Sequence, residues 1–351
     1  MGYNLQIEQI RKQPKRTIIF IVEDCLDKGL YPYERTVKLA QLLKEEEIHI
    51  FLRSSSHAGI AIFSEAKMSP ILFEKYEQLC KHLKRLEPDL LIRDGKDSER
   101  EDMELLKPFC KTIVHFDDFG TGNELADCVL LALYPELKDT LSPNMIGGSF
   151  AFAVPNDWPK SPDSEITQLN SLPHIVVAFE DGDPNNLTYR TLRHLTQLHI
   201  PLQITIVIDE TYSHSIDDLQ MMVLSRRNTS IARQKDALKS LLPTADIIIC
   251  NANYTPYKIA TYGIPCITLA QNERELLHAF PREQNGFIHL GLGRKMKQSH
   301  LQNAVMELLL HEARRERAIK KQRQLVLYDN YKTLQTLLLD FAYERHNIAS
   351  I

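Results

Sequence analysis

The sequence predicts an α/β protein made of two Rossmann-like domains that face each other across a cleft, with C-terminal helices packing back across them. Two observations support this. In both halves of the chain, short apolar runs such as Thr17–Val22 and Asp246–Ile249 alternate with stretches of helical period. This alternation is typical of parallel sheets with helical crossovers. A stretch rich in proline, at 141–173, separates the two halves and predicts a linker or excursion.

The first half predicts a parallel, doubly wound sheet. Thr17–Val22 is a continuous apolar run rich in β-branched residues, which predicts a strand buried on both faces. Tyr33–Glu46 carries its apolar residues at helical spacing. A second helix, Phe73–Leu86, should end near Pro88. The further strands expected in this half are Ile48–Leu52, Asp89–Ile92, Thr112–Phe116 and Cys128–Leu133.

The second half repeats the alternation. The strands expected here are His174–Phe179, Leu202–Ile208, Asp246–Ile249 and Cys266–Leu269. The helices expected here are Leu187–Gln197, Ser215–Ser225, Ile231–Leu242 and Tyr257–Tyr262. From Ser299 onward the chain has strong helical propensity and dense charge. We therefore expect an N-terminal domain at 1–155, a C-terminal domain at 165–300 and closing helices at 301–351.

Composition restricts the class of protein. The chain has 351 residues, of which 43% are hydrophobic and 25% charged, and its net charge is −4. Such a charge provides no cationic field for nucleic acid or an anionic membrane. The apolar runs are too short to span a bilayer and no signal peptide is recognised, so we expect a cytoplasmic protein. The six cysteines are scattered, which indicates reduced thiols rather than disulfides or a metal site.

One strand, turn and helix motif predicts an anion site. The buried strand Asp246–Ile249 is followed by polar residues that lead into a short helix ending at Gly263. The start of a helix offers unpaired N–H groups and the positive end of the helix dipole. The residues expected to meet a ligand there are Asn253, Tyr254, Thr255 and Lys258. The alternative for the first three is a helix cap, with Asn253 or Thr255 as the capping residue.

Carboxylates follow several of the predicted strands. Asp117 and Asp118 come directly after Thr112–Phe116, and Asp24 lies just past the first strand. Ligands of parallel sheets bind at the carboxyl ends of the strands, and paired carboxylates can divide acid and base roles. These three are the candidate catalytic residues, and turn or capping roles are the alternative. Asp183 is similarly either a ligand residue or the cap of the next helix.

Three segments together resemble one family, the nucleotide-sugar hydrolase of pseudaminic acid biosynthesis and its relatives in spore coat polysaccharide operons. The segments are Pro88–Leu131, Phe179–Thr188 and Ala245–Gly291. The resemblance implies the two-domain fold of the B-type glycosyltransferases and a cleft that binds a nucleotide sugar, linked through uridine diphosphate. It implies no cofactor and no metal. It adds Gly29, Arg35 and Asn272 to the expected binding residues, and it says nothing of oligomeric state.

The departures from this family pattern fall on the ligand site. Pro32 stands where the family has its histidine base, and proline has no group that moves a proton. Tyr31 replaces a glycine, and Lys258 replaces a glutamate that grips ribose hydroxyls. Glu180 and Asp181 replace two glycines and place carboxylates where they would repel a diphosphate.

Two functions are therefore expected. One is a divergent nucleotide-sugar hydrolase, or a glycosyltransferase-like protein, of surface or spore coat polysaccharide biosynthesis. In that case water would attack the nucleotide sugar, and Asp117, Asp118 or Asp24 would replace the lost base. The other is a catalytically inactive nucleotide-sugar-binding or scaffold protein of the same pathway.

Overall fold

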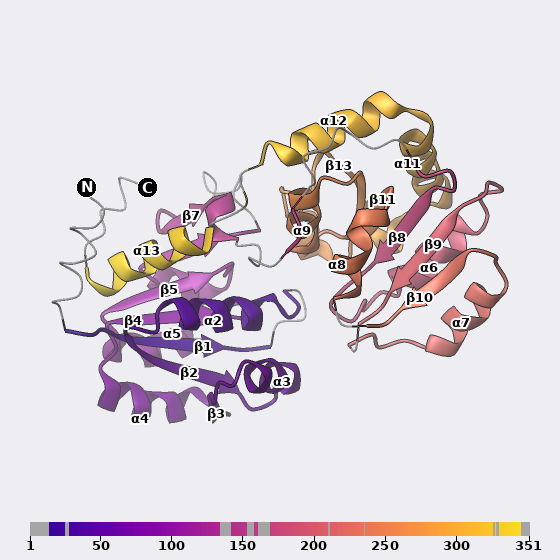
Figure 1. Ribbon diagram of the computed structural model, residues 1–351. Coiled ribbons are helices and arrows are strands. Elements are labelled where there is room, and N and C mark those ends of the chain that lie inside the picture. Colours follow the sequence, from indigo (N-terminus) through magenta and orange to yellow (C-terminus); the bar gives the residue numbers. More distant parts are fainter. Residues whose placement is uncertain are drawn as a thin grey trace.

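The protein contains two parallel β-sheets, each covered by helices (Figure 1). The computed structural model describes residues 14–24, 28–133, 142–152, 158–160, 169–209, 211–234, 236–325, 327 and 330–344. The two sheets belong to separate halves of the chain, and the α/β fold class predicted from the sequence is confirmed.

The first sheet has seven strands. They are β1 (Thr17–Val22), β2 (Glu47–Arg53), β3 (Ile71–Phe73), β4 (Leu90–Asp94), β5 (Thr112–Phe116), β6 (Cys128–Leu131) and β7 (Met145–Gly147). Their order is β3-β2-β1-β4-β5-β6-β7, and every neighbouring pair is parallel. The helices of this domain are α2 (Tyr31–Leu42), α3 (His57–Glu65), α4 (Tyr76–Leu86) and α5 (Arg100–Leu106).

The second sheet has six strands. They are β8 (His174–Ala178), β9 (Gln203–Val207), β10 (Thr229–Ala232), β11 (Ile247–Asn251), β12 (Cys266–Ala270) and β13 (Phe287–Leu292). Their order is β10-β9-β8-β11-β12-β13, again parallel throughout. The helices between them are α6 (Leu187–Leu195), α7 (Ile216–Leu224), α8 (Ala237–Leu241), α9 (Thr255–Tyr262) and α10 (Glu273–Leu276).

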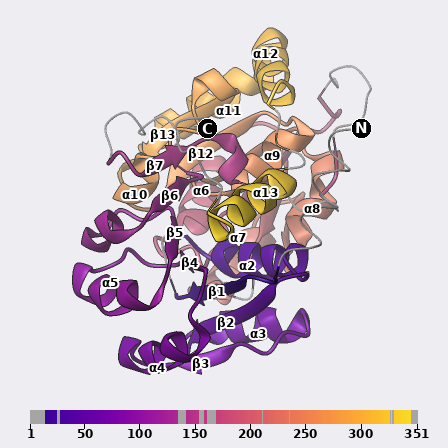
Figure 2. The same cartoon turned by 90° about the vertical axis from the view of Figure 1, so that its left-hand side faces the viewer.

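The last three helices that the structure describes are divided between the two domains. They are α11 (Gln298–Leu310), α12 (Glu312–Arg323) and α13 (Asn330–Ala342). Figures 1 and 2 show α12 lying along the C-terminal domain, whereas α13 lies on the N-terminal domain. The amide of Gln335 in α13 donates a hydrogen bond of 2.7 Å to the carbonyl oxygen of Leu42 in α2. The C-terminal segment therefore packs back onto the first domain, as expected.

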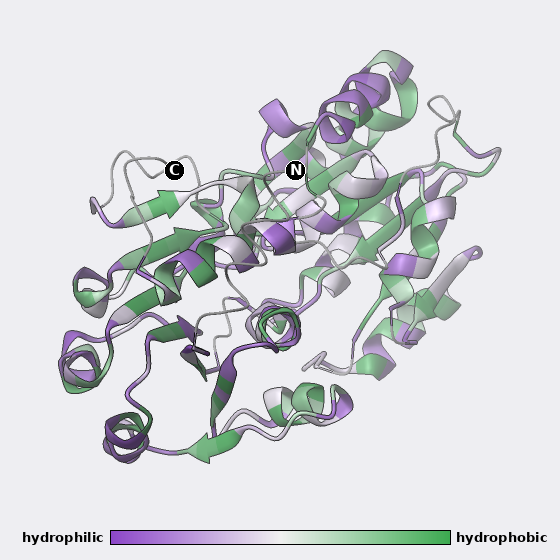
Figure 3. Ribbon diagram, turned by 60° about the vertical axis from the view of Figure 1, so that its left-hand side comes forward, coloured by the Kyte–Doolittle hydropathy of each residue, from purple (hydrophilic) through white to green (hydrophobic). Residues whose placement is uncertain are grey.

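The hydrophobic core is continuous from one domain to the other. The strands of both sheets are predominantly hydrophobic (Figure 3), which is typical of parallel sheets covered on both faces. One cluster of buried side chains joins residues of the first sheet, such as Phe20, to residues of the second, such as Val176, through Tyr31 and Tyr254. Two further clusters cover the outer face of each sheet. The domains are thus packed against each other.

Some of the expected elements were wrong or missed. The helix expected at Ile231–Leu242 is instead the edge strand β10 followed by the short α8. A short apolar run fits both the helical period of 3.6 residues and the strand period of two. The pairing of Thr229–Ala232 with β9 makes this segment a strand. The segment 141–173, expected to be a linker, contributes β7 to the first sheet. Within the described ranges, no helix is long and apolar enough to cross a membrane.

Candidate functional site

The carboxyl ends of the two sheets contribute residues that touch each other directly. The phenol of Tyr254 donates a hydrogen bond of 2.9 Å to Oδ2 of Asp117. The phenol of Tyr257 donates one of 2.5 Å to the carbonyl oxygen of Ala132. Arg274 donates one of 2.6 Å to the carbonyl oxygen of Asp117. Asp117 and Tyr254, two of the residues expected to line an open ligand cleft, therefore pair with each other across the domain interface.

A stack of aromatic rings, which we did not expect from the sequence, fills part of this interface. The ring centroids of Tyr31 and Tyr254 are 4.0 Å apart, and those of Tyr31 and Phe152 are 4.8 Å apart. The stack continues from Phe152 to Tyr257 at 4.1 Å and from Tyr257 to Phe280 at 3.6 Å. Rings at such distances bury large apolar areas and pack favourably. The substitution of a family glycine by Tyr31 was the signal available in the sequence.

Arg35, an expected ligand residue, is held by carboxylates of the protein. Its Nε and Nη2 atoms donate to the two carboxylate oxygens of Asp94 at 2.7 and 2.8 Å. Nη2 also lies 3.5 Å from Oδ2 of Asp117. Burial alone would lower the pKa of Arg35, but the charge of Asp94 and the other neighbours raises it well above its ordinary value. Arg35 is therefore a fixed, paired cation inside the domain interface.

Asp117 is fully buried and bonded through both oxygens. Its Oδ1 accepts hydrogen bonds from the backbone N–H groups of Ala132 at 2.7 Å and Leu133 at 3.1 Å. Its Oδ2 accepts the hydrogen bond from the phenol of Tyr254. Its backbone is left-handed, with φ of +49°. These contacts join the end of β6 to the loop after β5, which is the turn role that we considered as the alternative.

Asp118 is also buried and is held by a cationic environment. Its Oδ1 accepts from the N–H groups of Ser98 and Gly120, each at 2.9 Å. Its Oδ2 lies 2.6 Å from Nδ1 of His115 and 3.5 Å from Arg93. Burial would raise the pKa of Asp118, but His115 and Arg93 hold it far below its ordinary value. A carboxylate with such a low pKa is a weak proton acceptor.

Asp24 differs from the two buried carboxylates because it is exposed. Its Oδ1 accepts a hydrogen bond from the phenol of Tyr33, and its Oδ2 accepts one of 3.3 Å from the hydroxyl of Ser55. It follows the end of β1, where water reaches it. Of the three candidate catalytic residues, Asp24 is therefore the one that a substrate could contact without displacing protein groups.

Asp181 occupies the space beside Gly29. Its Oδ1 accepts a hydrogen bond of 3.1 Å from the N–H of Leu30, and its Oδ2 accepts one from the side-chain amide of Asn253. Gly29 has φ of +60°, and a Cβ atom added there would overlap the carboxyl group of Asp181. Burial and the charge of neighbouring Glu180 raise the pKa of Asp181 to about 7. A carboxylate from the second domain thus accepts the hydrogen bond of the Leu30 N–H, which lies at the start of α2.

Glu180 and the start of α9 form a second internal anion contact. The hydroxyl of Thr255 donates a hydrogen bond of 2.7 Å to Glu180, and Nζ of Lys258 lies 3.6 Å from the same carboxylate. Lys258 also lies over the ring of Trp158, 5.7 Å from its centroid. Burial would lower the pKa of Lys258, but Glu180 and other carboxylates raise it above its ordinary value. Lys258 is therefore charged and paired inside the chain.

The remaining expected ligand residues make capping contacts. Oδ1 of Asn253 accepts from the N–H of Thr255 at 3.1 Å, at the start of α9. Asp183 accepts from the N–H groups of Leu187 and Thr188, each at 2.8 Å, and from the amide of Gln271 at 2.6 Å. Oδ1 of Asn272 accepts from the N–H of Glu275 at 2.9 Å and caps α10. These contacts satisfy the orphan donors at the starts of three helices.

No protein-family model matches the chain, but two curated proteins do. The uncharacterized protein MJ1062 of Methanocaldococcus jannaschii is 24% identical over 270 residues, which cover 73% of this chain and 56% of that protein. The chain thus spans little more than half of that relative's length. The spore coat polysaccharide biosynthesis protein SpsG of Bacillus subtilis is 20% identical over 279 residues, covering 76% of this chain and 81% of SpsG.

Solved structures share the architecture over almost the whole chain. MurG of Acinetobacter baumannii superimposes with a TM-score of 0.64 at 14% identity, covering 93% of this chain and all of MurG. The UDP-GlcNAc 2-epimerase of Neisseria meningitidis, solved with UDP-GlcNAc bound, has a TM-score of 0.57 at 9% identity and covers 93% of this chain and 100% of its own. This protein therefore has the two-domain fold of the B-type glycosyltransferases. In sequence, the chain is distantly similar to SpsG.

Proposed function

We propose that this chain is a non-catalytic, cytoplasmic protein of surface or spore coat polysaccharide biosynthesis. It keeps the B-type glycosyltransferase architecture and fills the crevice between the domains with its own side chains. The observation that carries this proposal is the position of Asp181 beside Gly29. Its carboxylate accepts hydrogen bonds from the N–H of Leu30 and from the side-chain amide of Asn253. In this proposal, the diphosphate of a nucleotide sugar would have to lie beside this same glycine and the start of α9, where the expected binding residues Asn253 and Thr255 are found.

The charges around this position oppose a diphosphate. Glu180 and Asp181 both lie in the loop after β8. Two unit charges about 4 Å apart interact by about 4 kcal/mol at an effective dielectric constant near 20. A diphosphate beside these two residues would lose about that much for each close pair in which the carboxylate is ionised. Lys258, at the start of α9, is already paired with Glu180. Binding of a nucleotide sugar would require this loop to move away.

The buried carboxylates are also poorly suited to activate water. Pro32 has no group to accept a proton. Asp117 has hydrogen bonds on both oxygens, and the pKa of Asp118 is held low by His115 and Arg93 after burial is counted. A general base works best when its pKa lies near the working pH and when it can reach the substrate. Neither residue meets both conditions.

The similarity to SpsG supports the pathway rather than a reaction. SpsG is described as a spore coat polysaccharide biosynthesis protein, and the shared region covers 81% of its length. A non-catalytic protein of such a pathway would act as a scaffold for the enzymes that transfer or modify sugars. This role uses the fold as a rigid body, which the continuous core and the aromatic stack across the interface favour.

A second candidate function is hydrolysis of a nucleotide sugar with Asp24 as the base. The exposure of Asp24 at the end of β1 favours it, because a carboxylate at this position can meet both water and substrate. This candidate also requires Asp181 to leave Gly29 when the substrate enters.

Release of nucleoside diphosphate from nucleotide sugars separates the two candidates. The protein, at a concentration equal to the substrate, is incubated with uridine, cytidine and guanosine diphosphate sugars in turn, and the free diphosphate is measured. The non-catalytic proposal predicts no release above the protein-free rate. Release that disappears in Asp24→Ala supports the hydrolase and overturns the main proposal. Release that persists in Asp24→Ala contradicts both.

A further inference from the structure

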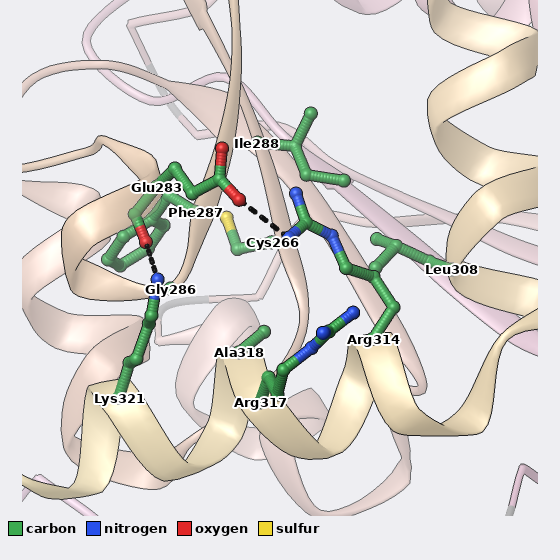
Figure 4. Close-up of a pocket in the computed structure, with 10 residues that line it drawn as sticks. All are labelled: Cys266, Glu283, Gly286, Phe287, Ile288, Leu308, Arg314, Arg317, Ala318 and Lys321. Carbon is green, nitrogen blue, oxygen red and sulfur yellow. Dashed lines mark hydrogen bonds and ion pairs between the residues drawn. The ribbon is translucent and has the colours of Figure 1, made fainter.

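The C-terminal domain has a cavity at the amino ends of its strands, which is the opposite end of the sheet from the domain interface. The cavity, of about 170 Å³, is bounded by α12, by the end of α11 and by the first residues of β12 and β13 (Figure 4). Cys266 is the first residue of β12, and Phe287 is the first residue of β13. The interface residues of this domain follow the carboxyl ends of β8, β11 and β12, at the opposite end of the sheet. The cavity is therefore separate from the crevice, although its Phe287 packs against Phe280 at the end of the aromatic stack, with ring centroids 5.6 Å apart. A ligand in the cavity would not depend on the function proposed above.

A glycine allows α12 to form the wall of this cavity. Gly286 has φ of +86°, and a Cβ atom added there would overlap the carbonyl oxygen of Ala318 in α12. The amide of Gln322 donates a hydrogen bond of 3.2 Å to the carbonyl oxygen of Gly286, and Nζ of Lys321 donates one of 2.6 Å to that of Glu283. The helix is thus fixed close to the loop before β13, and the cavity remains beside this contact.

The polar side of the cavity is cationic. Arg314, Arg317 and Lys321 lie three and four residues apart, which places them on one face of α12, and all three line the cavity. Arg314 is paired with Glu283 at 2.7 Å and with Glu307 at 3.0 Å. Among the described residues, no carboxylate lies within ion-pair distance of Arg317. Three cations and one carboxylate, Glu283, line the space, so an anion would find a surplus of positive charge.

The other side of the cavity is apolar. Phe287, Ile288 and Leu308 line it together with Cys266 (Figure 4). Ligand pockets commonly combine such an apolar wall with a few polar groups that fix orientation. An apolar cavity of about 150 Å³ holds a molecule of the size of benzene. The space beneath α12 therefore suits one small ring or a short branched chain.

We propose that this cavity is a binding site for a small organic anion that carries a carboxylate or phosphate group on an apolar body. The anionic group would lie against Arg317 and Arg314, since guanidinium groups match the geometry of carboxylate and phosphate oxygens. The apolar body would lie against Phe287, Ile288 and Leu308.

Phenyl phosphate is a suitable probe because it has both parts. Calorimetric titration of the full chain should show saturable binding with a dissociation constant below about 1 mM, which corresponds to about 4 kcal/mol. Inorganic phosphate and phenol, titrated separately, should each bind at least about tenfold more weakly, because each lacks one of the two contacts.

Three variants locate the binding. Arg317→Gln removes an exposed cation and should weaken binding by about fivefold, the upper range for an exposed charge pair. Ala318→Leu extends a side chain into the cavity and should abolish binding without changing the charge. Lys320→Gln is the matched control, because Lys320 is exposed on the same helix and does not line the cavity. It should change the affinity less than twofold.

Four results would overturn the proposal. They are the absence of saturable binding of phenyl phosphate up to several times the stated limit, equal binding of inorganic phosphate, unchanged binding by Ala318→Leu, and an equal effect of Lys320→Gln and Arg317→Gln. Thermal unfolding of each variant is measured alongside. If Ala318→Leu does not fold, Leu308→Met, which keeps the volume but reshapes the apolar wall, takes its place and should alter the affinity for phenyl phosphate.

Discussion

The raised pKa of Asp181 predicts an unusual dependence of stability on pH. Burial and the charge of Glu180 raise this pKa from 3.8 to about 7. The folded protein therefore holds the proton of Asp181 more tightly than the unfolded chain does. By linkage, Asp181 makes the free energy of unfolding fall as pH rises from about 4 to about 7, and the loss is complete above that range. Asp181→Asn removes this titration.

The size of the effect follows from the two pKa values. At about 1.4 kcal/mol for each pKa unit, their difference gives an upper limit of about 4 kcal/mol. The side chain is only partly buried, so solvent screening reduces the effect, and we expect about 1–2 kcal/mol between pH 5 and pH 8. The asparagine also places two amide donors next to each other at Asn253, but this cost does not depend on pH. The slope of stability against pH therefore isolates the carboxylate.

Urea denaturation of the wild type and Asp181→Asn at several values between pH 5 and pH 8 measures this slope. The wild type should lose about 1–2 kcal/mol relative to the variant across the range. Asp24→Asn, which removes an exposed carboxylate, controls for the change in net charge. Equal slopes for the wild type and Asp181→Asn, or a wild type that gains stability as pH rises relative to the variant, would show that the folded protein does not hold the proton of Asp181 more tightly than the unfolded chain.

Three further predictions concern the interface and the buried carboxylates. Asp118 has a lowered pKa, so its contribution to the free energy of unfolding is present above pH 3.8, its ordinary pKa, and is lost progressively as pH falls below that value. Asp118→Asn should therefore lower the free energy of unfolding, measured by urea denaturation, by about 3–5 kcal/mol at pH 7 and by less at pH 3. A loss that does not depend on pH would contradict this. Tyr257→Phe leaves the carbonyl of Ala132 without its donor and should cost about 1–3 kcal/mol, whereas an unchanged midpoint would show that the bond contributes nothing. Gly29→Ala should destabilise by more than about 1 kcal/mol because of its φ of +60°, and combination with Asp181→Gly should recover part of the loss in a double-mutant cycle; simple additivity would argue against their contact.

The central strands could be predicted from the sequence, whereas the edges of the sheets could not. Thr17–Val22 and Thr112–Phe116 have the predicted bounds because they are buried on both faces and therefore continuously apolar. The edge strands β3, β7, β10 and β13 are partly exposed, and the first three are also short. Their assignment depends on pairing with a neighbouring strand, which hydrophobic periodicity does not record.

The chemistry of the site was partly visible in the sequence, but its contacts were not. The replacement of two family glycines by Glu180 and Asp181 indicated two carboxylates in the loop after β8, and the diphosphate position expected beside them stays a prediction. The partner of Asp181 is the N–H of Leu30, 151 residues earlier in the chain. Such a contact depends on how the two domains dock, and no local pattern encodes it. The pairing of His115 with Asp118 was missed for a related reason, since the turn after β5 brings them together.

Titration of uridine diphosphate into the protein at pH 8, followed by calorimetry, tests the closed crevice most directly. We expect no saturable heat for the wild type. Asp181→Gly should gain measurable affinity, because it removes the carboxylate at a position whose φ of +65° suits glycine. Micromolar binding of uridine diphosphate to the unaltered chain would contradict the account, since the donors beside Gly29 would then be open to a ligand.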